Sequence, residues 1–186
     1  IKLRDVDSNW DVINISFAEP VSAGSTDGKM RFNISGLSSS YTKEDFKQDI
    51  KTLQAKGKKI VLSIGGYEGY FSLDSQAAVN QFVSDIKGFV DEYGFDGIDI
   101  DLEQSSVQFA QGNDKDIRQI NSPKLANMVS AIKTIVHSYG DDFILSWAPE
   151  TFYMQMGYMY YAGINQYCDS RAGSYLPMIN ALRGET

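Results

Sequence analysis

The sequence predicts an α/β fold with a parallel sheet or barrel, and two observations support this prediction. Strand-like and helix-like segments alternate four times, and each unit spans about 35 to 50 residues, which is typical of consecutive β/α units. The chain has 186 residues, of which 42% are hydrophobic, enough to bury one substantial core. We therefore expect a single globular domain or part of one.

The first unit combines a strand over residues 10–18 with a helix over residues 42–57. The strand is apolar, rich in β-branched residues and ended by Glu19-Pro20. A loop rich in Gly and Ser follows, with a short extended piece over residues 30–34. Thr42 and Asp45 form the pattern of a capping box, and Gly57 is a stop signal, so these residues should bound the helix.

The second unit has a strand over residues 58–66, which ends in Ser63-Ile64-Gly65-Gly66. Glycines at a strand end let a ligand or another backbone segment approach closely. Asp74-Ser75 is the expected cap of the next helix, and Gly94 its end. Apolar residues at helical spacing between them predict a face that packs against the sheet.

The third strand, expected over residues 95–103, carries an unusual set of acids. Asp99, Asp101 and Glu103 alternate with apolar residues, so the three carboxyl groups should share one face of the strand. Mutual repulsion and burial raise the pKa of at least one such group, which can then act as a general acid near neutral pH. Glu103 is the candidate, because it is last on the strand and chemistry in parallel α/β folds lies at that end.

The remaining segments complete the pattern. Residues 104–122 are expected to form a polar loop that serves as one wall of a groove, and Pro123 to start a helix that runs to Tyr139. Residues 142–150 should form the fourth strand, with Glu150 on the same face as Ser146 and close to Glu103. An aromatic-rich loop over residues 151–167 suits carbohydrate binding or local packing, and a last helix is expected over residues 174–183, with Leu176, Ile179 and Leu182 inward.

Charge and composition narrow the partners. The net charge is -7 and no cluster of Lys or Arg appears, which argues against nucleic acid or an anionic membrane and favours a neutral polysaccharide. With one His and one Cys in the chain, no site for a soft metal is indicated. A magnesium or manganese site at Asp99 and Asp101 is chemically reasonable, whereas a solvated acidic strand is disfavoured by the intervening Ile and Leu residues.

Two blocks identify a resemblance. Asp96-Gly97-Ile98-Asp99-Ile100-Asp101-Leu102-Glu103 matches the Asp-x-x-Asp-x-Asp-x-Glu signature of family 18 glycoside hydrolases, the chitinases and their relatives. Ser63-Ile64-Gly65-Gly66, on the preceding strand, resembles the Ser-x-Gly-Gly block of the same family, and bacterial chitinases are the most similar. The resemblance implies a TIM (β/α)8 barrel, a fold of about 250 residues. Residues 1–186 would cover about four consecutive units, the second to fifth strands.

The resemblance also implies a mechanism that uses the N-acetyl group of the substrate as nucleophile, with retention of configuration. Glu103 would protonate the leaving glycosidic oxygen and later deprotonate water. Asp101 would orient the acetamido group, and Asp99 would share a proton with Asp101.

Other residues take supporting roles by the same resemblance. Asp96 would hold the start of the strand and Ser63 would support the acids. Gly66 and Tyr67 would lie beside the sugar, and Glu150 would offer a polar side chain to the substrate. No metal or cofactor is implied.

The implied function is endo-hydrolysis of β-1,4 N-acetylglucosamine linkages in chitin by a secreted, monomeric enzyme, although no signal peptide is visible in this segment. The family also uses a tyrosine from the sixth strand, so we expect residues 1–186 alone to be inactive. Alternatives are an endo-β-N-acetylglucosaminidase acting on N-glycans and a chitin-binding lectin, although such lectins generally lose the acid that Glu103 represents. A metal-dependent phosphoryl-transfer enzyme is disfavoured because basic residues are missing around the motif.

Overall fold

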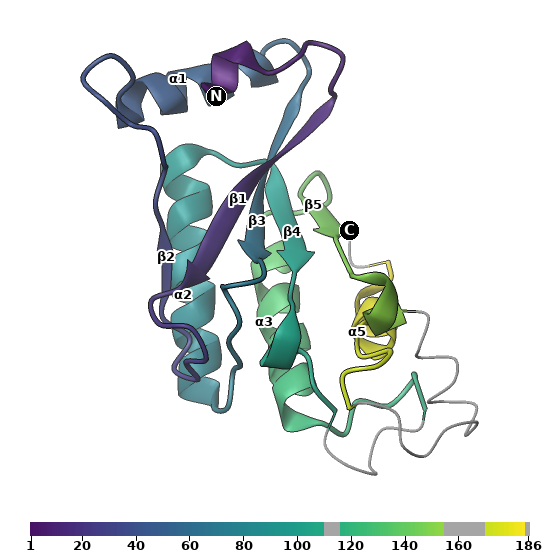
Figure 1. Cartoon of the computed structure of the whole chain (residues 1–186). Coiled ribbons are helices and arrows are strands. Elements are labelled where there is room, and N and C mark those ends of the chain that lie inside the picture. Colours follow the sequence, from purple (N-terminus) through teal and green to yellow (C-terminus); the bar gives the residue numbers. More distant parts are fainter. Residues whose placement is uncertain (110–115, 155–169, 185–186) are drawn as a thin grey trace.

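The computed structural model describes residues 1–109, 116–154 and 170–184, and it contains one mixed sheet (Figure 1). The strands follow the order β2-β1-β3-β4-β5 across the sheet; β2 is antiparallel to β1, and the other neighbours are parallel. The strand bounds are β1 Val12–Pro20, β2 Met30–Phe32, β3 Lys59–Gly65, β4 Gly97–Asp101 and β5 Ile144–Trp147. The predicted parallel α/β arrangement is therefore confirmed.

Helices connect the parallel strands and cover one face of the sheet. Figure 1 shows α2 and α3 side by side behind the strands, with α1 near the amino-terminal ends of β3 and β4. The helical bounds are η1 Leu3–Asp5, α1 Lys43–Gln54, α2 Gln76–Tyr93, η2 Gln104–Ser106, α3 Pro123–His137 and α5 Tyr175–Leu182. Within the described ranges, no helix combines the length and apolar character needed to cross a bilayer.

Local signals set the starts of α1 and α2 and the end of α2 where the sequence predicted them, whereas α1 ends at Gln54, before Gly57, and α3 ends at His137, before Tyr139. Thr42 and Asp45 form a reciprocal capping box at the start of α1. The Ser75 hydroxyl accepts a hydrogen bond from the Ala78 N–H at the start of α2. Gly94 ends α2 in a left-handed conformation, with φ of 73°, which a glycine adopts without strain.

The core lies between the sheet and these helices. Ile98, Ile100 and Leu102 are at most 1% exposed and point towards the helices. Because side chains alternate along a strand, Asp99 and Asp101 must occupy the opposite, inner face. The acidic strand is shorter than predicted: β4 ends at Asp101, and Glu103 follows it in extended conformation as the residue before η2.

Two further predictions need correction. Helix α5 buries Tyr175, Met178 and Leu182, whereas Leu176 and Ile179 are only half-buried, because the Tyr175 hydroxyl is anchored inside the protein. The segment after Glu103 is not simply a polar loop, because it begins with η2, and Val107 and Phe109 are buried in the core.

Some predicted features fall partly outside the described residues. Of the aromatic-rich loop over 151–167, only residues 151–154 are described, and they are helical. There Tyr153 is buried and Phe152 half-buried, so both pack locally. Residues 110–115 of the loop after η2 and residues 155–169 lie outside the described part.

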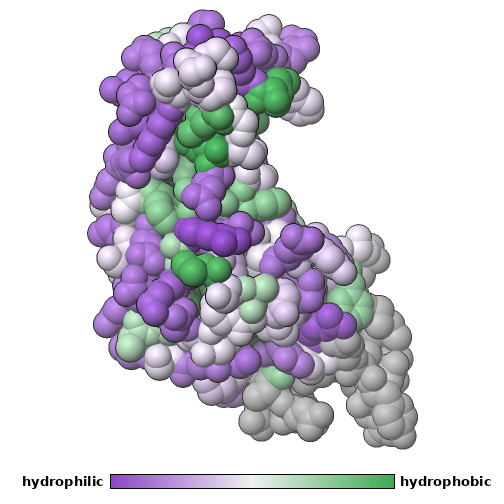
Figure 2. Space-filling view, turned by 60° about the vertical axis from the view of Figure 1, so that its left-hand side comes forward, coloured by the Kyte–Doolittle hydropathy of each residue, from purple (hydrophilic) through white to green (hydrophobic). Residues whose placement is uncertain are grey.

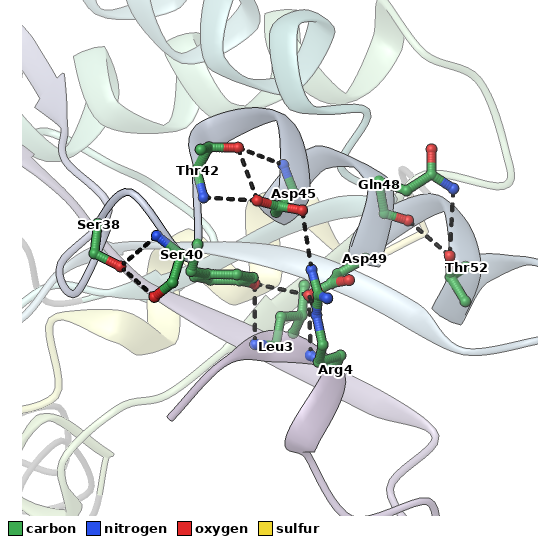
Figure 3. Close-up of polar contacts among 10 residues, drawn as sticks. Leu3, Arg4, Ser38, Ser40, Thr42, Asp45, Gln48, Asp49 and Thr52 are labelled. Carbon is green, nitrogen blue, oxygen red and sulfur yellow. Dashed lines mark hydrogen bonds and ion pairs between the residues drawn. The ribbon is translucent and has the colours of Figure 1, made fainter.

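A polar network attaches η1 to α1 at the amino-terminal side of the sheet (Figure 3). The Asp49 carboxylate accepts hydrogen bonds from the Arg4 Nε at 2.9 Å, the Arg4 backbone N–H at 3.2 Å and the Tyr41 hydroxyl at 2.8 Å. The Tyr41 hydroxyl in turn accepts from the Leu3 N–H at 3.2 Å. Asp49 is 6% exposed, so its burial is offset by these donors.

Candidate active site

Asp99 lies at the centre of the inner face, between two serines on the neighbouring strands. The strand register places Ser63 of β3 and Ser146 of β5 directly beside it. The Ser63 hydroxyl donates to Oδ2 of Asp99 at 2.8 Å, and the Ser146 hydroxyl donates to Oδ1 at 2.6 Å. With 3% exposure, Asp99 is a buried carboxyl group whose two oxygens both have donors.

Asp101 lies one step further along β4. Burial raises the pKa of Asp101, and the charges of Asp99 and Glu150 raise that pKa further. Both Asp99 oxygens accept hydrogen bonds from serine hydroxyls, and Asp99 affects Asp101 through its charge. Proton sharing between Asp99 and Asp101 stays a prediction.

Glu103 lies beyond the carboxyl end of β4, and its pKa is shifted further than that of any other acid of this site. Burial, a hydrogen bond with Glu150 and the charges of Asp101 and Glu150 raise the pKa of Glu103 to about 7. A hydrogen bond between two carboxyl groups requires a proton, which the raised pKa assigns to Glu103. Glu103 is therefore protonated in a large fraction of molecules near neutral pH, as a general acid must be.

Glu150 follows β5 and reaches the same place from the neighbouring strand. Its side chain is exposed, and it contacts Glu103 as the period-two count along residues 142–150 predicted. Trp147 lies on the other face, where its ring packs edge-on against Tyr175 with ring centroids 5.9 Å apart. The two faces of β5 therefore separate the polar site from the core.

The turn after β3 is joined closely to the acidic strand. A side chain at Gly65, where φ is 111°, would collide with the carbonyl oxygen of Asp101. The Gly66 N–H donates to that same oxygen at 2.8 Å. Tyr67 follows with 70% of its surface exposed, so this turn presents an aromatic ring near the acids.

Asp96 lies apart from the other acids, at the amino-terminal end of β4. Its Oδ2 accepts from the Ile60 N–H at 2.8 Å and from the Gln54 side-chain amide at 2.9 Å. Lys59 forms an ion pair with Oδ1 at 3.6 Å. Asp96 therefore ties β4 to β3 and α1 and does not join the carboxyl cluster.

Three residues of the site were not predicted as site residues. Ser146 was foreseeable, since the alternation along residues 142–150 puts it on the Glu150 face. Tyr175 could not be foreseen, because its partner lies 73 positions away in the sequence. Its hydroxyl donates to the Leu102 carbonyl at 2.8 Å and accepts from the Leu102 N–H at 2.5 Å. Gln104 has φ of 52°, and its amide donates to the Tyr67 carbonyl at 2.6 Å. A positive φ at a non-glycine residue leaves no clear mark in the sequence.

The described side chains do not suggest a metal centre. Across residues 1–109, 116–154 and 170–184, no group of three or more His, Cys, Asp or Glu side chains is arranged to hold a metal ion. The Asp99 oxygens face serine hydroxyls instead.

Carboxyl groups of separated pKa at the carboxyl ends of parallel β/α units are an arrangement that acid-using glycosidases employ. The chain belongs to glycosyl hydrolases family 18, whose family model matches residues 6–171. It is 43% identical over 99% of its length to Exochitinase 1 of Streptomyces olivaceoviridis, and 43% identical over its full length to Chitinase Chi52 of Paenibacillus xylanexedens.

A solved structure supports the same assignment. The fold matches that of a family 18 chitinase from Chromobacterium violaceum with a TM-score of 0.79 and 36% identity, over 98% of this chain and 43% of that one. The four parallel strands therefore belong to a TIM barrel. The chain spans 31% and 33% of the lengths of the two curated relatives.

Proposed function

We propose that this chain carries the acid-bearing part of a chitinase that hydrolyses β-1,4 linkages between N-acetylglucosamine residues. The observation that carries the proposal is Glu103, whose pKa of about 7 makes it a proton donor at the carboxyl end of β4. The names of the relatives, an exochitinase and a chitinase, support the same substrate class.

Each acid has a distinct step in the proposed mechanism. Glu103 protonates the glycosidic oxygen of the leaving sugar while the acetamido oxygen of the substrate attacks the anomeric carbon. Asp101, two residues before Glu103, orients the acetamido group and stabilises the positive charge that forms on it. Water then attacks the anomeric carbon as Glu103 takes its proton, which restores the acid and retains the configuration.

Neighbouring residues maintain this arrangement. Asp99, held by the hydroxyls of Ser63 and Ser146, raises the pKa of Asp101 through its charge. Glu150 accepts the hydrogen bond of the protonated Glu103 carboxyl between turnovers, and its exposed side chain is open to a substrate hydroxyl. Gly66 and Tyr67 lie in the turn that hydrogen-bonds to the Asp101 carbonyl, and the exposed Tyr67 ring suits the apolar face of a sugar.

The finer features of the proposal are an endo-type cleavage, a secreted location and a monomeric enzyme without cofactor. A neutral polysaccharide substrate agrees with the net charge of -7.

Chromatography of the early products from a long oligosaccharide tests the endo assignment. Internal cleavage yields products of several lengths at once, whereas release of a single short product would contradict endo cleavage.

The test of the reaction is hydrolysis of a fluorogenic N-acetylglucosamine oligomer by the protein in which this sequence occurs. Glu103→Gln should lower kcat/KM by about 10²- to 10⁴-fold, since the amide cannot donate a proton as an acid does. Glu44→Gln, on the exposed face of α1, is the matched control. A chelator should leave the rate unchanged. A fully active Glu103→Gln variant, or loss of turnover with chelator, would overturn the proposal.

A further inference from the structure

Buried contacts, rather than surface features, distinguish the surroundings of Glu103. On the face that Figure 2 shows, exposed hydrophobic residues form separate small groups among hydrophilic ones, and no continuous apolar patch appears among the coloured residues. By contrast, tyrosine hydroxyls hold the backbone on both sides of Glu103. The Tyr175 hydroxyl bonds to the N–H and the carbonyl of Leu102, and the Tyr153 hydroxyl accepts a hydrogen bond from the Gln104 N–H.

Gln104 needs such support because its backbone is strained. Its φ of 52° lies in the left-handed region, which a residue with a side chain adopts at a cost and keeps only where its surroundings hold it. Two contacts do so: the Tyr153 hydroxyl at the backbone N–H, and the Tyr67 carbonyl, which accepts from the side-chain amide at 2.6 Å. Because the strained residue directly follows the acid, loss of the Tyr153 contact would let the Glu103 backbone move.

Tyr153 also contacts the partner of the acid. It belongs to the helical residues 151–154, and its N–H donates to the Glu150 carbonyl at 3.0 Å. The charges of Glu150 and Glu103 both act on the Tyr153 hydroxyl, so this hydroxyl lies near both carboxyl groups. One residue therefore links the backbone next to the acid with the backbone of the residue that accepts its hydrogen bond.

Tyr153 is not suited to proton transfer or to substrate contact. It is 3% exposed, and its ring packs against that of Tyr175 with ring centroids 5.8 Å apart. Burial raises the pKa of Tyr153, so its hydroxyl stays neutral near neutral pH. Any effect of this hydroxyl on the reaction must therefore pass through Glu103 and Glu150.

We propose that Tyr153 is a positioning residue for the acid: its hydroxyl fixes the peptide after Glu103 and its N–H fixes Glu150, which keeps the two carboxyl groups in hydrogen-bonding contact. This inference rests on the proposed function and adds to it a residue that acts on the acid without touching the substrate.

The electrostatics of the pair give this role a measurable consequence. After burial, the hydrogen bond with Glu150 is the largest cause of the raised pKa of Glu103. The charged groups that face Glu103 are Asp101 and Glu150, and Arg171 faces the Tyr153 hydroxyl. Loosening the contact with Glu150 should therefore lower the pKa of Glu103 towards its ordinary value.

The test is Tyr153→Phe in the protein in which this sequence occurs, with hydrolysis of a soluble fluorogenic N-acetylglucosamine oligomer measured across pH. The variant keeps the ring and loses only the hydroxyl. Glu103 acts in its protonated form, so the high-pH limb of kcat/KM should move to lower pH. We expect kcat to fall by about ten-fold and KM to change little, since small misplacements of a reacting group are costly. Tyr139→Phe, which loses a hydroxyl bonded to Asp91, is the matched control.

A double variant shows whether Tyr153 acts through Glu150. Adding Tyr153→Phe to Glu150→Gln should move the high-pH limb no further than Glu150→Gln alone, because the contact that Tyr153 maintains is already lost. Thermal unfolding checks that each variant is folded. Tyr153→Met also lacks the hydroxyl and adapts to the available space, so it takes the place of the Phe variant if that one does not fold, with the same shift expected.

The outcomes separate this inference from the proposed function. A fall in kcat with an unmoved limb would mean that Tyr153 has only a structural role, and a further shift in the double variant would mean that it does not act through Glu150. Either result would overturn the positioning role and leave the proposed function standing. If the parent cleaved no oligomer, the proposed function would fall, and the positioning role with it.

Discussion

The raised pKa of Glu103 depends in part on Glu150, a single residue that follows the neighbouring strand. Its pKa of about 7 has burial as the largest cause and Glu150 as the second, through both a hydrogen bond and charge. The raised pKa of Glu103 therefore depends on residues that follow two neighbouring strands, and a substitution of Glu150, after β5, can change this pKa while leaving Glu103 in place. The pH dependence of the reaction follows from this contact.

Glu150→Gln should shift the loss of kcat/KM at high pH to a lower pH. Glu103 acts in its protonated form, so activity falls as the pH rises through its pKa. Without the Glu150 carboxylate, the Glu103 proton loses a charged acceptor and the pKa decreases towards its ordinary value. The measurement is the pH profile of kcat/KM with a soluble oligomer, with Glu44→Gln as control. An unmoved high-pH limb would show that Glu150 does not raise the pKa of Glu103.

Gly65→Ala tests the close approach of the turn after β3 to the acidic strand. The new methyl group would meet the Asp101 carbonyl oxygen, and φ of 111° is unfavourable for alanine. We expect a cost of about 3 kcal/mol or more in the free energy of unfolding, measured in urea, because overpacking adds to backbone strain. Gly57→Ala, with φ of 81° and open space around it, should cost only about 1 to 2 kcal/mol. Equal costs would contradict the collision.

At the element scale, buried side chains attach helices to the sheet and thereby hold the site. Tyr175 of α5 places its hydroxyl against the backbone of Leu102, between Asp101 and Glu103. Burial raises the pKa of Tyr175 far above its usual range, so the hydroxyl stays neutral and can both donate and accept. Helix α5 thus fixes the backbone from which both acids project.

Tyr175→Phe should lower kcat more than it changes KM. It leaves the Leu102 N–H and carbonyl without this partner, which we expect to cost about 1 to 3 kcal/mol of stability and to loosen the acid-bearing segment. Tyr139→Phe is the matched control, because its hydroxyl donates to Asp91 at 2.7 Å on the outside of the helices. The checks are steady-state kinetics and urea unfolding of both variants. A similar loss of kcat in the two would argue against a specific role of Tyr175.

Asp49→Ala should destabilise the attachment of η1 to α1. Arg4 and the Tyr41 hydroxyl would lose a shared acceptor that is 6% exposed, which we expect to cost about 2 to 4 kcal/mol. The network lies at the amino-terminal side of the sheet, so kcat of the folded variant should stay close to that of the parent. Thermal unfolding with Glu44→Ala as control measures the first effect. A large fall in kcat at low temperature would contradict the separation from the site.

The elements themselves show what sequence reasoning can reach. Caps and glycines act locally, so Thr42, Ser75 and Gly94 marked helix ends that the structure confirms. Alternation is also local, and it placed Asp99 and Asp101 on the inner face. The contacts of Tyr175 and Asp49 depend on tertiary packing, which the sequence does not show. The periodic pattern of an amphipathic helix predicts which face is buried, but it does not show which residue on or beside that face is buried with a hydrogen-bonded polar group.

At the scale of the whole molecule, the sheet separates two environments. Its helix-covered face holds the apolar core, and its inner face holds Asp99, Asp101 and the serines. Grouping acids on one face has a thermodynamic consequence, because a carboxyl whose pKa is raised by folding binds its proton more tightly in the folded state. The stability of the whole domain must then depend on the ionisation of Glu103.

Glu103→Gln should therefore stabilise the protein most at high pH. Below pH 4.5, the ordinary pKa of a glutamate, Glu103 is protonated in both states; as the pH rises to about 7 the unfolded chain ionises first, and the folded state loses stability. Glutamine does not titrate, so the gain of the variant over the parent should grow between pH 4.5 and 7 and level off above. Urea unfolding across this range measures it, with Glu44→Gln as control. A gain independent of pH would mean that folding does not raise the pKa of Glu103.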